Sequence, residues 1–268
     1  SLSRLAAVNP SVSDPNRIYP GQTLVIPESG AAGEIVVNGY VTDASGETLR
    51  QTLPYLTFLS PFSFRSDRSG NLTRTYHVNT SMPAEYRAGN LMTVTNLREQ
   101  GGFSSEIAHA IFTDQAVQDN FLSNVEAVLS GGGWYGVNLD FEYVYLFDRQ
   151  SYNQFLRRLT DRMHALGYIV VTALAPKVSA DQSGLLYSAH DYAFHGASAD
   201  YVVLMTYEWG YTYGPAMAVA PIDQVRRVLD YAVGVMPAGK ILMGVPNYGY
   251  NWTLPFRQGA AAKPLTNV

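Results

Sequence analysis

The chain has 268 residues, a formal net charge of −4, 47% hydrophobic residues and 15% charged residues. This composition predicts a globular protein with a large core, and the acidic balance argues against a nucleic-acid partner. The absence of cysteine excludes disulfides and thiolate chemistry, and no apolar run reaches the roughly 20 residues that a membrane-spanning helix needs.

Residues 1–28 differ from the rest of the chain. Turn clusters at 9–11 and 14–16 precede residues 18–27, whose pattern predicts a turn followed by a short strand. The segment is too short to bury a core of its own. We therefore predict a small module over 1–28, a flexible linker over 29–33 and a large domain over 34–268.

From residue 34 onward, apolar β-branched runs alternate with amphipathic stretches. The predicted strands are 34–42, 55–64, 91–96, 135–144, 168–175, 201–208 and 240–248. The predicted helices are 104–112, 114–130, 148–166 and 221–236, with Asp114 as an N-cap and the glycines at 131–133 ending a helix. Strand–helix units with nearly continuous apolar strands indicate a parallel sheet covered by helices.

Polar residues recur where these strands end. They are Tyr40, Ser60, Asn96, Glu142, Tyr207 and Asn247. A (β/α)8 barrel collects residues from many strand ends on one face, whereas an open parallel sheet, the alternative, gathers its ligand mainly at one switch point. We predict a (β/α)8 TIM barrel of class α/β, whose eighth strand lies beyond the C-terminus of this chain.

The strand at 135–142 is the most informative segment. Apolar residues alternate with Asn138, Asp140 and Glu142, so these three side chains share one face. Burying carboxylates is costly unless they are paired or used. Three interpretations are open: a satisfied ion pair, a metal site, and acid–base catalysis. The five histidines show no ligand spacing, and we expect no metal and no cofactor.

Geometry narrows the catalytic interpretation. Residues i and i+2 lie roughly 6.6 Å apart along a strand, with side chains pointing the same way. Glycosidases with two working carboxylates place them on opposite sides of the scissile bond, which Asp140 and Glu142 cannot do easily. One carboxyl then acts as proton donor with its pKa raised by the other, and the nucleophile is the substrate's own acetamido oxygen.

At this point the chain resembles glycoside hydrolase family 18, the chitinase-like (β/α)8 enzymes. Residues 135–142 (YGVNLDFE) resemble the family's DGxDxDxE signature. Residues 205–208 (MTYE) resemble its sixth-strand motif, and 244–252 (GVPNYGYNW) its seventh strand and the following turn. The resemblance covers about residues 34–255 and includes Gly39-Tyr40 and Ser60-Pro61-Phe62.

The resemblance implies a role for each matching position. Glu142 is expected to be the general acid/base, and Asp140 the neighbour that orients the 2-acetamido group. Tyr207 is expected to hydrogen-bond the acetamido carbonyl. Met205 is expected to line the pocket under the acetamido methyl, although Tyr207 and Met205 could also be ordinary barrel core. The expected substrate contacts are Asn138, Tyr40, Met205, Glu208, Asn247 and Tyr248.

Three positions depart from the family pattern. Tyr135 and Asn138 replace the first two acids of the signature, so the two-aspartate relay is absent, although Asn138 can still hydrogen-bond Asp140. Glu208 replaces an aspartate. The chain stops before the family's eighth strand and its tryptophan, so we expect the native protein to be longer.

Residues 9–27 resemble the second half of a LysM module, which binds N-acetylglucosamine-containing glycans; a turn-rich linker is the alternative. LysM with a chitinase-like barrel resembles bacterial cortex-lytic N-acetylglucosaminidases of spore germination. The resemblance implies a retaining, substrate-assisted hydrolase of β-1,4 bonds in peptidoglycan, a monomer at the cell wall or spore cortex or secreted. A chitinase and a non-catalytic glycan-binding barrel are the alternatives.

Overall fold

The computed structural model describes residues 2–12, 14, 18–19, 21–25, 35–42, 46–75 and 88–266. The chain divides into two compact units, Ser1–Ile35 and Val36–Val268. The linker predicted at 29–33 lies outside the described residues, as do residues 15–16 of the second N-terminal turn cluster.

The first unit contains helix α1 (Leu2–Ala7) and the predicted turn, where Gly21 has a φ of 84°. A short strand was predicted after this turn, within residues 18–27; its described part, residues 22–25, is not in a strand, and residues 26–27 lie outside the described residues. The buried side chain of Asn9 takes the place of a strand partner. It donates to the Val25 carbonyl at 2.7 Å, accepts from the Val25 N–H at 2.7 Å, and donates to the Leu5 carbonyl at 2.8 Å.

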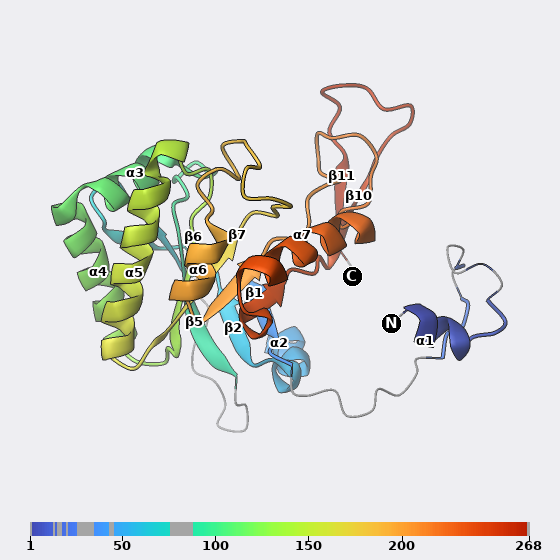
Figure 1. Ribbon diagram of the computed structural model, residues 1–268, viewed down its shortest axis with the longest axis horizontal. Helices are drawn as coiled ribbons and strands as arrows, with labels where there is room; N and C mark the ends of the chain where they lie inside the picture. The colour runs from blue at the N-terminus through green and yellow to red at the C-terminus, as the bar shows by residue number, and fades with distance from the viewer. Residues whose placement is uncertain are drawn as a thin grey trace. The chain divides into compact units, whose positions relative to one another are not determined.

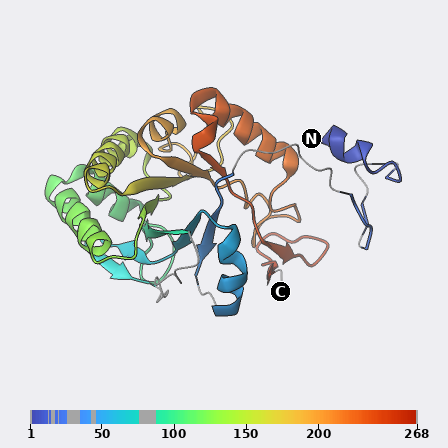
Figure 2. The ribbon, with the colours of Figure 1, turned by 90° about the horizontal axis from the view of Figure 1, so that it is seen from below.

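The second unit is built on a curled sheet of parallel strands, with helices on its outer side (Figures 1 and 2). The strands that follow one another around it are β1 (Asn38–Val41), β2 (Phe58–Pro61), β5 (Gly89–Thr95), β6 (Gly136–Asp140), β7 (Ile169–Leu174), β8 (Tyr201–Leu204) and β9 (Ile241–Met243). Each pairs in parallel with the next. The seven predicted strands are thus confirmed, in the predicted order.

Helices connect these strands. They are α2 (Gly46–Thr52), α3 (Ser105–Thr113), α4 (Gln115–Ser130), α5 (Arg149–Ala165), α6 (Tyr192–Ser198) and α7 (Ile222–Val235), with short 3₁₀ turns at Leu53–Tyr55, Leu146–Asp148 and Ala238–Lys240. α3, α4 and α6 begin after a residue whose side chain caps the helix N-terminus. Asp114 caps α4 as predicted, accepting from the N–H groups of Ala116 and Val117. Gly131 ends the same helix.

Several predicted strands were too long at their C-terminal ends, among them β6, which ends at Asp140 where the prediction ran to 144. β8 ends at Leu204 and β9 at Met243, where the predictions ran to 208 and 248. Gly244 still donates to the Leu204 carbonyl at 2.8 Å, and Thr206 Oγ1 donates to the Gly244 carbonyl at 2.7 Å. The segments that follow β8 and β9 are no longer strands, so Tyr207 and Asn247 lie on loops past the strand ends.

Two small antiparallel pairs and helices α1, α2 and α6 were not predicted. β3 (Phe64–Ser66) pairs with β4 (Leu72–Arg74), and β10 (Tyr248–Asn251) with β11 (Lys263–Thr266). The first pair closes through a tight turn in which Asp67 Oδ1 accepts from the N–H groups of Ser69 and Asn71. The three or four residues of each of these strands contain no apolar β-branched run of the kind that marks the strands of the main sheet.

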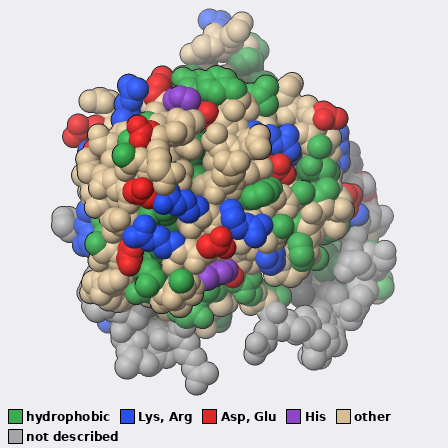
Figure 3. Space-filling model, turned by 60° about the vertical axis from the view of Figure 1, so that its left-hand side comes forward, with side chains coloured by type: hydrophobic (Ala, Val, Ile, Leu, Met, Phe, Trp, Pro, Cys, Tyr) green, Lys and Arg blue, Asp and Glu red, His purple; other side chains and the backbone are tan. Residues whose placement is uncertain are grey.

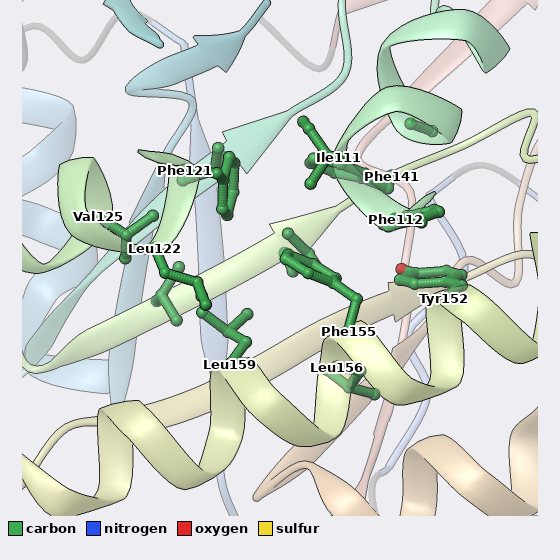
Figure 4. Packing of buried hydrophobic residues seen from close by; sticks show 14 of the residues in the cluster. Ile111, Phe112, Phe121, Leu122, Val125, Phe141, Tyr152, Phe155, Leu156 and Leu159 are labelled. Carbon is green, nitrogen blue, oxygen red and sulfur yellow. The ribbon is translucent and has the colours of Figure 1, made fainter. Parts of the chain in front are cut away.

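The core lies on both sides of the sheet. On the outer side, Val137, Leu139 and Phe141 are fully buried against α3, α4 and α5, where Phe141 packs among other aromatic rings (Figure 4). On the inner side, a second buried cluster includes Leu91, Val171, Val203 and Met205. The alternation predicted for β6 is therefore confirmed: its apolar row faces the helices.

The outer surface over α3, α4 and α5 carries interspersed acidic and basic side chains (Figure 3). Two ion pairs join α4 to α5 here, Arg158 with Asp119 and Arg162 with Glu126. Among the helices that the structure describes, none is both long and apolar enough to cross a membrane.

Candidate active site

The inner face of the sheet holds a polar layer at mid-height. Asn138 on β6 donates through Nδ2 to the Tyr40 hydroxyl on β1 at 2.7 Å and to Ser60 Oγ on β2 at 3.1 Å. Ser60 in turn donates to Asn38 Oδ1 at 2.8 Å. β1 and β6 stand three places apart in the sheet, so these contacts require the sheet to curl around a shared interior.

Asp140 is the next residue on this face toward the strand's C-terminal end. It is 5% exposed, and burial raises its pKa. Its Oδ1 and the Oδ1 of Asn138 are buried without a hydrogen-bond partner among the described residues. The expected Asn138–Asp140 hydrogen bond is not formed, because the Asn138 amide donates to Tyr40 and Ser60 instead. An open acceptor on Asp140 suits a ligand N–H.

Glu142 lies two residues past the end of β6, on the same side as Asp140. Burial raises its pKa, and the nearby carboxylates of Asp140 and Glu208 raise it further, in that order of size. A carboxyl group with a raised pKa holds its proton near neutral pH and can donate it to a leaving group.

Tyr207 belongs to the same group of side chains. Burial raises the pKa of its hydroxyl, with further contributions from Asp140, Glu142 and Glu208. Met205, 9% exposed, is a member of the inner apolar cluster against which Tyr40 and Tyr207 pack. The structure therefore brings an apolar wall, a protonated hydroxyl and two carboxyls together at one end of the sheet.

Glu208 is held by two tyrosines of β10. Tyr248 donates to Glu208 Oε1 at 2.5 Å, and Tyr250 donates to the same oxygen at 2.9 Å. Glu208 has a left-handed φ of 68° in the loop after β8, a conformation that is uncommon for a non-glycine residue. Glu208 and Tyr248 thus contact each other, and Tyr250 is a member of the group that the sequence did not suggest.

Asn247 is separate from these residues. It is exposed in the loop between β9 and β10, and the part of the chain that the structure describes offers no hydrogen bond from it to Glu142, Tyr207 or Glu208. Ser60, noted from sequence only as a strand-end residue, lies instead in the polar layer. Within the described residues, no group of three or more acidic or histidine side chains is placed to hold a metal.

Gly244 is required by the position of Tyr207. A Cβ at residue 244 would lie 2.6 Å from Tyr207 Cε1 and 2.7 Å from the Leu204 carbonyl. Gly244→Ala is therefore expected to displace the Tyr207 ring and lower kcat by about 10-fold or more, since small misplacements at a reacting centre are costly. Steady-state kinetics measures the change. Gly249→Ala, whose Cβ would have no atom within 4 Å, is the control and should retain full activity.

Comparison with known sequences gives two family matches. The model of glycosyl hydrolases family 18 matches residues 98–262, and the LysM domain model matches residues 1–27. The first match includes β6, the β8 loop and β10, the elements that carry most of the site. The second falls on the N-terminal unit.

Individual relatives agree with these matches. The cortical fragment-lytic enzyme of Bacillus subtilis (strain 168) is 43% identical over 219 residues, covering 82% of this chain and 51% of that protein. The crystal structures of the spore cortex-lytic enzyme SleL from Bacillus cereus and Bacillus megaterium QM B1551 both align with a TM-score of 0.84, at 34% and 35% identity. Both alignments cover 100% of this chain; they cover 66% of the Bacillus cereus chain and 63% of the Bacillus megaterium chain. The chain spans about half the length of the curated relatives it matches.

Proposed function

Because this chain belongs to the glycosyl hydrolases of family 18, we propose that it cleaves the β-1,4 bond that follows N-acetylglucosamine in bacterial peptidoglycan, with retention of configuration. One observation carries the proposal: Asp140 and Glu142 come from one strand end, where burial, and after it the Asp140 carboxylate, raises the pKa of Glu142. Two carboxyls side by side cannot flank a sugar ring, so the substrate's acetamido group supplies the nucleophile.

In the first step, Glu142 transfers its proton to the glycosidic oxygen as the acetamido carbonyl oxygen attacks C1. The bond between C1 and the leaving oxygen breaks, and an oxazolinium ion forms on the sugar. Asp140 Oδ1, buried and without a partner among the described residues, accepts the acetamido N–H and stabilises the positive charge. The Tyr207 hydroxyl donates to the acetamido carbonyl oxygen and orients it toward C1.

In the second step, the Glu142 carboxylate takes a proton from water while the water oxygen attacks C1 from the face that the leaving group vacated. The acetamido group is restored, and Glu142 is protonated again for the next cycle. Two inversions at C1 give net retention.

The remaining predicted residues hold the sugar. Met205 provides an apolar wall for the acetamido methyl. Glu208 and Tyr248, joined by their hydrogen bond, contact sugar hydroxyls, and Asn247 contacts the sugar chain from the exposed loop. Tyr40 and Asn138, hydrogen-bonded to each other, complete the set of expected substrate contacts.

The N-terminal unit supports the choice of peptidoglycan. We propose that residues 1–27 bind N-acetylglucosamine-containing glycan, as their match to the LysM model suggests. Attachment to the wall would raise the local concentration of the active site without new contacts to the scissile bond. The expected location is the cell wall or spore cortex, in keeping with the spore cortex-lytic relatives.

The test compares release of reducing ends from purified spore cortex and from colloidal chitin. We expect the cortex to be cleaved faster, and proton NMR to detect the β-anomer as the first product. Cleavage of chitin alone would identify a chitinase. Binding without any cleavage would identify a glycan-binding barrel, and an initial α-anomer would contradict the substrate-assisted mechanism.

A further inference from the structure

Glu142 stands on a piece of backbone that the sheet no longer supports. The pairing of β6 with β5 ends at the partners Thr95 and Asp140, and its pairing with β7 ends one residue earlier, at Leu139 and Thr172. Directly after Glu142, Tyr143 adopts a left-handed φ of 55°. Strand pairing therefore does not fix the direction in which the Glu142 side chain points.

A buried amide replaces the missing strand partner. Asn96, 0% exposed and next to the end of β5, accepts from the Glu142 N–H at 3.0 Å and donates to the Glu142 carbonyl at 2.8 Å. Its Nδ2 also donates to the Ser104 carbonyl at 3.0 Å. One side chain thus satisfies both backbone polar groups of Glu142, as a neighbouring strand would, and ties them to the start of α3.

The residues on either side of Glu142 are held in the same way. His190, 1% exposed, accepts from the Ala175 N–H at Nδ1 at 2.8 Å, which assigns its proton to Nε2. Nε2 then donates to the Phe141 carbonyl at 3.2 Å, and burial lowers the pKa of His190 to about 4, so the ring stays neutral. On the other side, Ser105 Oγ donates to the Tyr143 carbonyl at 2.5 Å.

We infer that Asn96, Ser105 and His190 form a backbone clamp that positions Glu142 for proton transfer. Three consecutive carbonyls, from Phe141 to Tyr143, each receive a hydrogen bond from one of these side chains. The inference rests on the proposed function, because it assigns a purpose to the orientation of Glu142. The three residues act through the backbone of 141–143, so they are positioning residues and not catalytic ones.

A clamp and a purely structural role predict different results. Loss of packing would lower the amount of folded protein but leave each folded molecule fully active. Loss of the clamp leaves the fold in place and lets the proton donor move away from the glycosidic oxygen. The clamp therefore predicts a lower kcat for each folded molecule, with KM little changed, and faster amide exchange confined to residues 141–145.

Asn96→Ala is the first test, made in the full chain. We expect kcat per folded molecule to fall by about 10-fold or more, with KM within about twofold of wild type. Hydrogen-exchange mass spectrometry should detect lost protection in the peptide that contains 141–145. Asn90→Ala is the matched control: Asn90 is buried on the same strand, donates to the Gly133 carbonyl at 3.1 Å, and lies at the opposite end of β5. It should lower stability but leave kcat and the exchange of 141–145 unchanged.

Ser105→Ala keeps the inference testable if Asn96→Ala does not fold. It removes one link at little cost in volume, and kcat should fall several-fold with the melting temperature nearly unchanged. Thr113→Ala, which removes a hydroxyl bonded to the His109 carbonyl at the other end of α3, is its control. Wild-type kcat in both Asn96→Ala and Ser105→Ala would overturn the clamp while the proposed function stands. A wild-type chain that cleaves no N-acetylglucosamine substrate would contradict the function instead, and amide exchange would still decide whether the clamp holds this backbone.

Discussion

Glu142→Gln is expected to lower kcat by at least ~10²-fold while glycan affinity stays close to that of wild type. The amide has nearly the same shape as the carboxylic acid but cannot give up a proton to the glycosidic oxygen. Binding, measured by calorimetry with an N-acetylglucosamine oligosaccharide, should change little, because sugar hydroxyls and the acetamido group contact other side chains. Kinetics on the same preparation measures the loss of turnover.

Glu126→Gln is the control for this variant. Glu126 pairs with Arg162 on the outer surface, so its substitution should leave kcat unchanged. Equal turnover by wild type and Glu142→Gln would remove Glu142 from the mechanism, and with it the role of Asp140 as its electrostatic partner.

Glu142→Gln is also expected to be more stable than wild type at neutral pH. Burial raises the pKa of Glu142 in the folded state above its value in the unfolded chain. Glu142 therefore contributes most to the stability of the folded state below the unfolded pKa of about 4.3. This contribution to the free energy of unfolding is lost as pH rises through the folded pKa. Glutamine has no such loss. Melting temperatures should agree near pH 4 and differ by a few degrees, in favour of the variant, near pH 8.

Asp140→Asn is expected to have the next largest effect, lowering kcat by about 10²-fold. The variant can no longer supply negative charge beside the oxazolinium ion. It also removes the carboxylate that raises the pKa of Glu142, so the basic limb of the kcat profile should move to lower pH. A full pH–rate profile for both proteins measures the two effects together.

Asp200→Asn is the matched control for this change. Asp200 precedes β8 at the opposite end of the sheet, where it bonds His164 and the Val170 N–H, so its loss should alter stability only. An Asp140→Asn profile with an unmoved basic limb would show that Asp140 does not act on the protonation of Glu142.

The sheet and its main helices could be predicted from the sequence because their patterns are long. β5, β6 and β7 are buried on both faces; β5 and β7 read as mainly apolar runs and β6 as an alternation of apolar and polar residues. α4 and α5 repeat their apolar positions over several turns. The short strand predicted within residues 18–27 is absent from its described part, 22–25, where the side chain of Asn9 satisfies the backbone of Val25. Such a contact has no local signature in the sequence.

The site, too, has features that could be predicted from the sequence and features that could not. The shared face of Asn138 and Asp140 follows from strand periodicity alone, whereas Glu142 lies past the end of β6. The hydrogen bond from Asn138 to Tyr40 does not, because it depends on how far the sheet curls between β1 and β6. The two hydrogen bonds between Asn96 and Glu142 could not be predicted from the sequence either, since a strand-end asparagine has many possible partners.

The central claim is that a protonated Glu142 and the substrate's own acetamido group act together at one strand end. A crystal structure of Glu142→Gln with a bound N-acetylglucosamine oligosaccharide tests it most directly. We expect residue 142 within hydrogen-bond distance of the glycosidic oxygen, the acetamido N–H on Asp140, and its carbonyl on the Tyr207 hydroxyl with the oxygen facing C1. An oligosaccharide bound with its acetamido group turned away from Asp140 and Tyr207 would contradict the account.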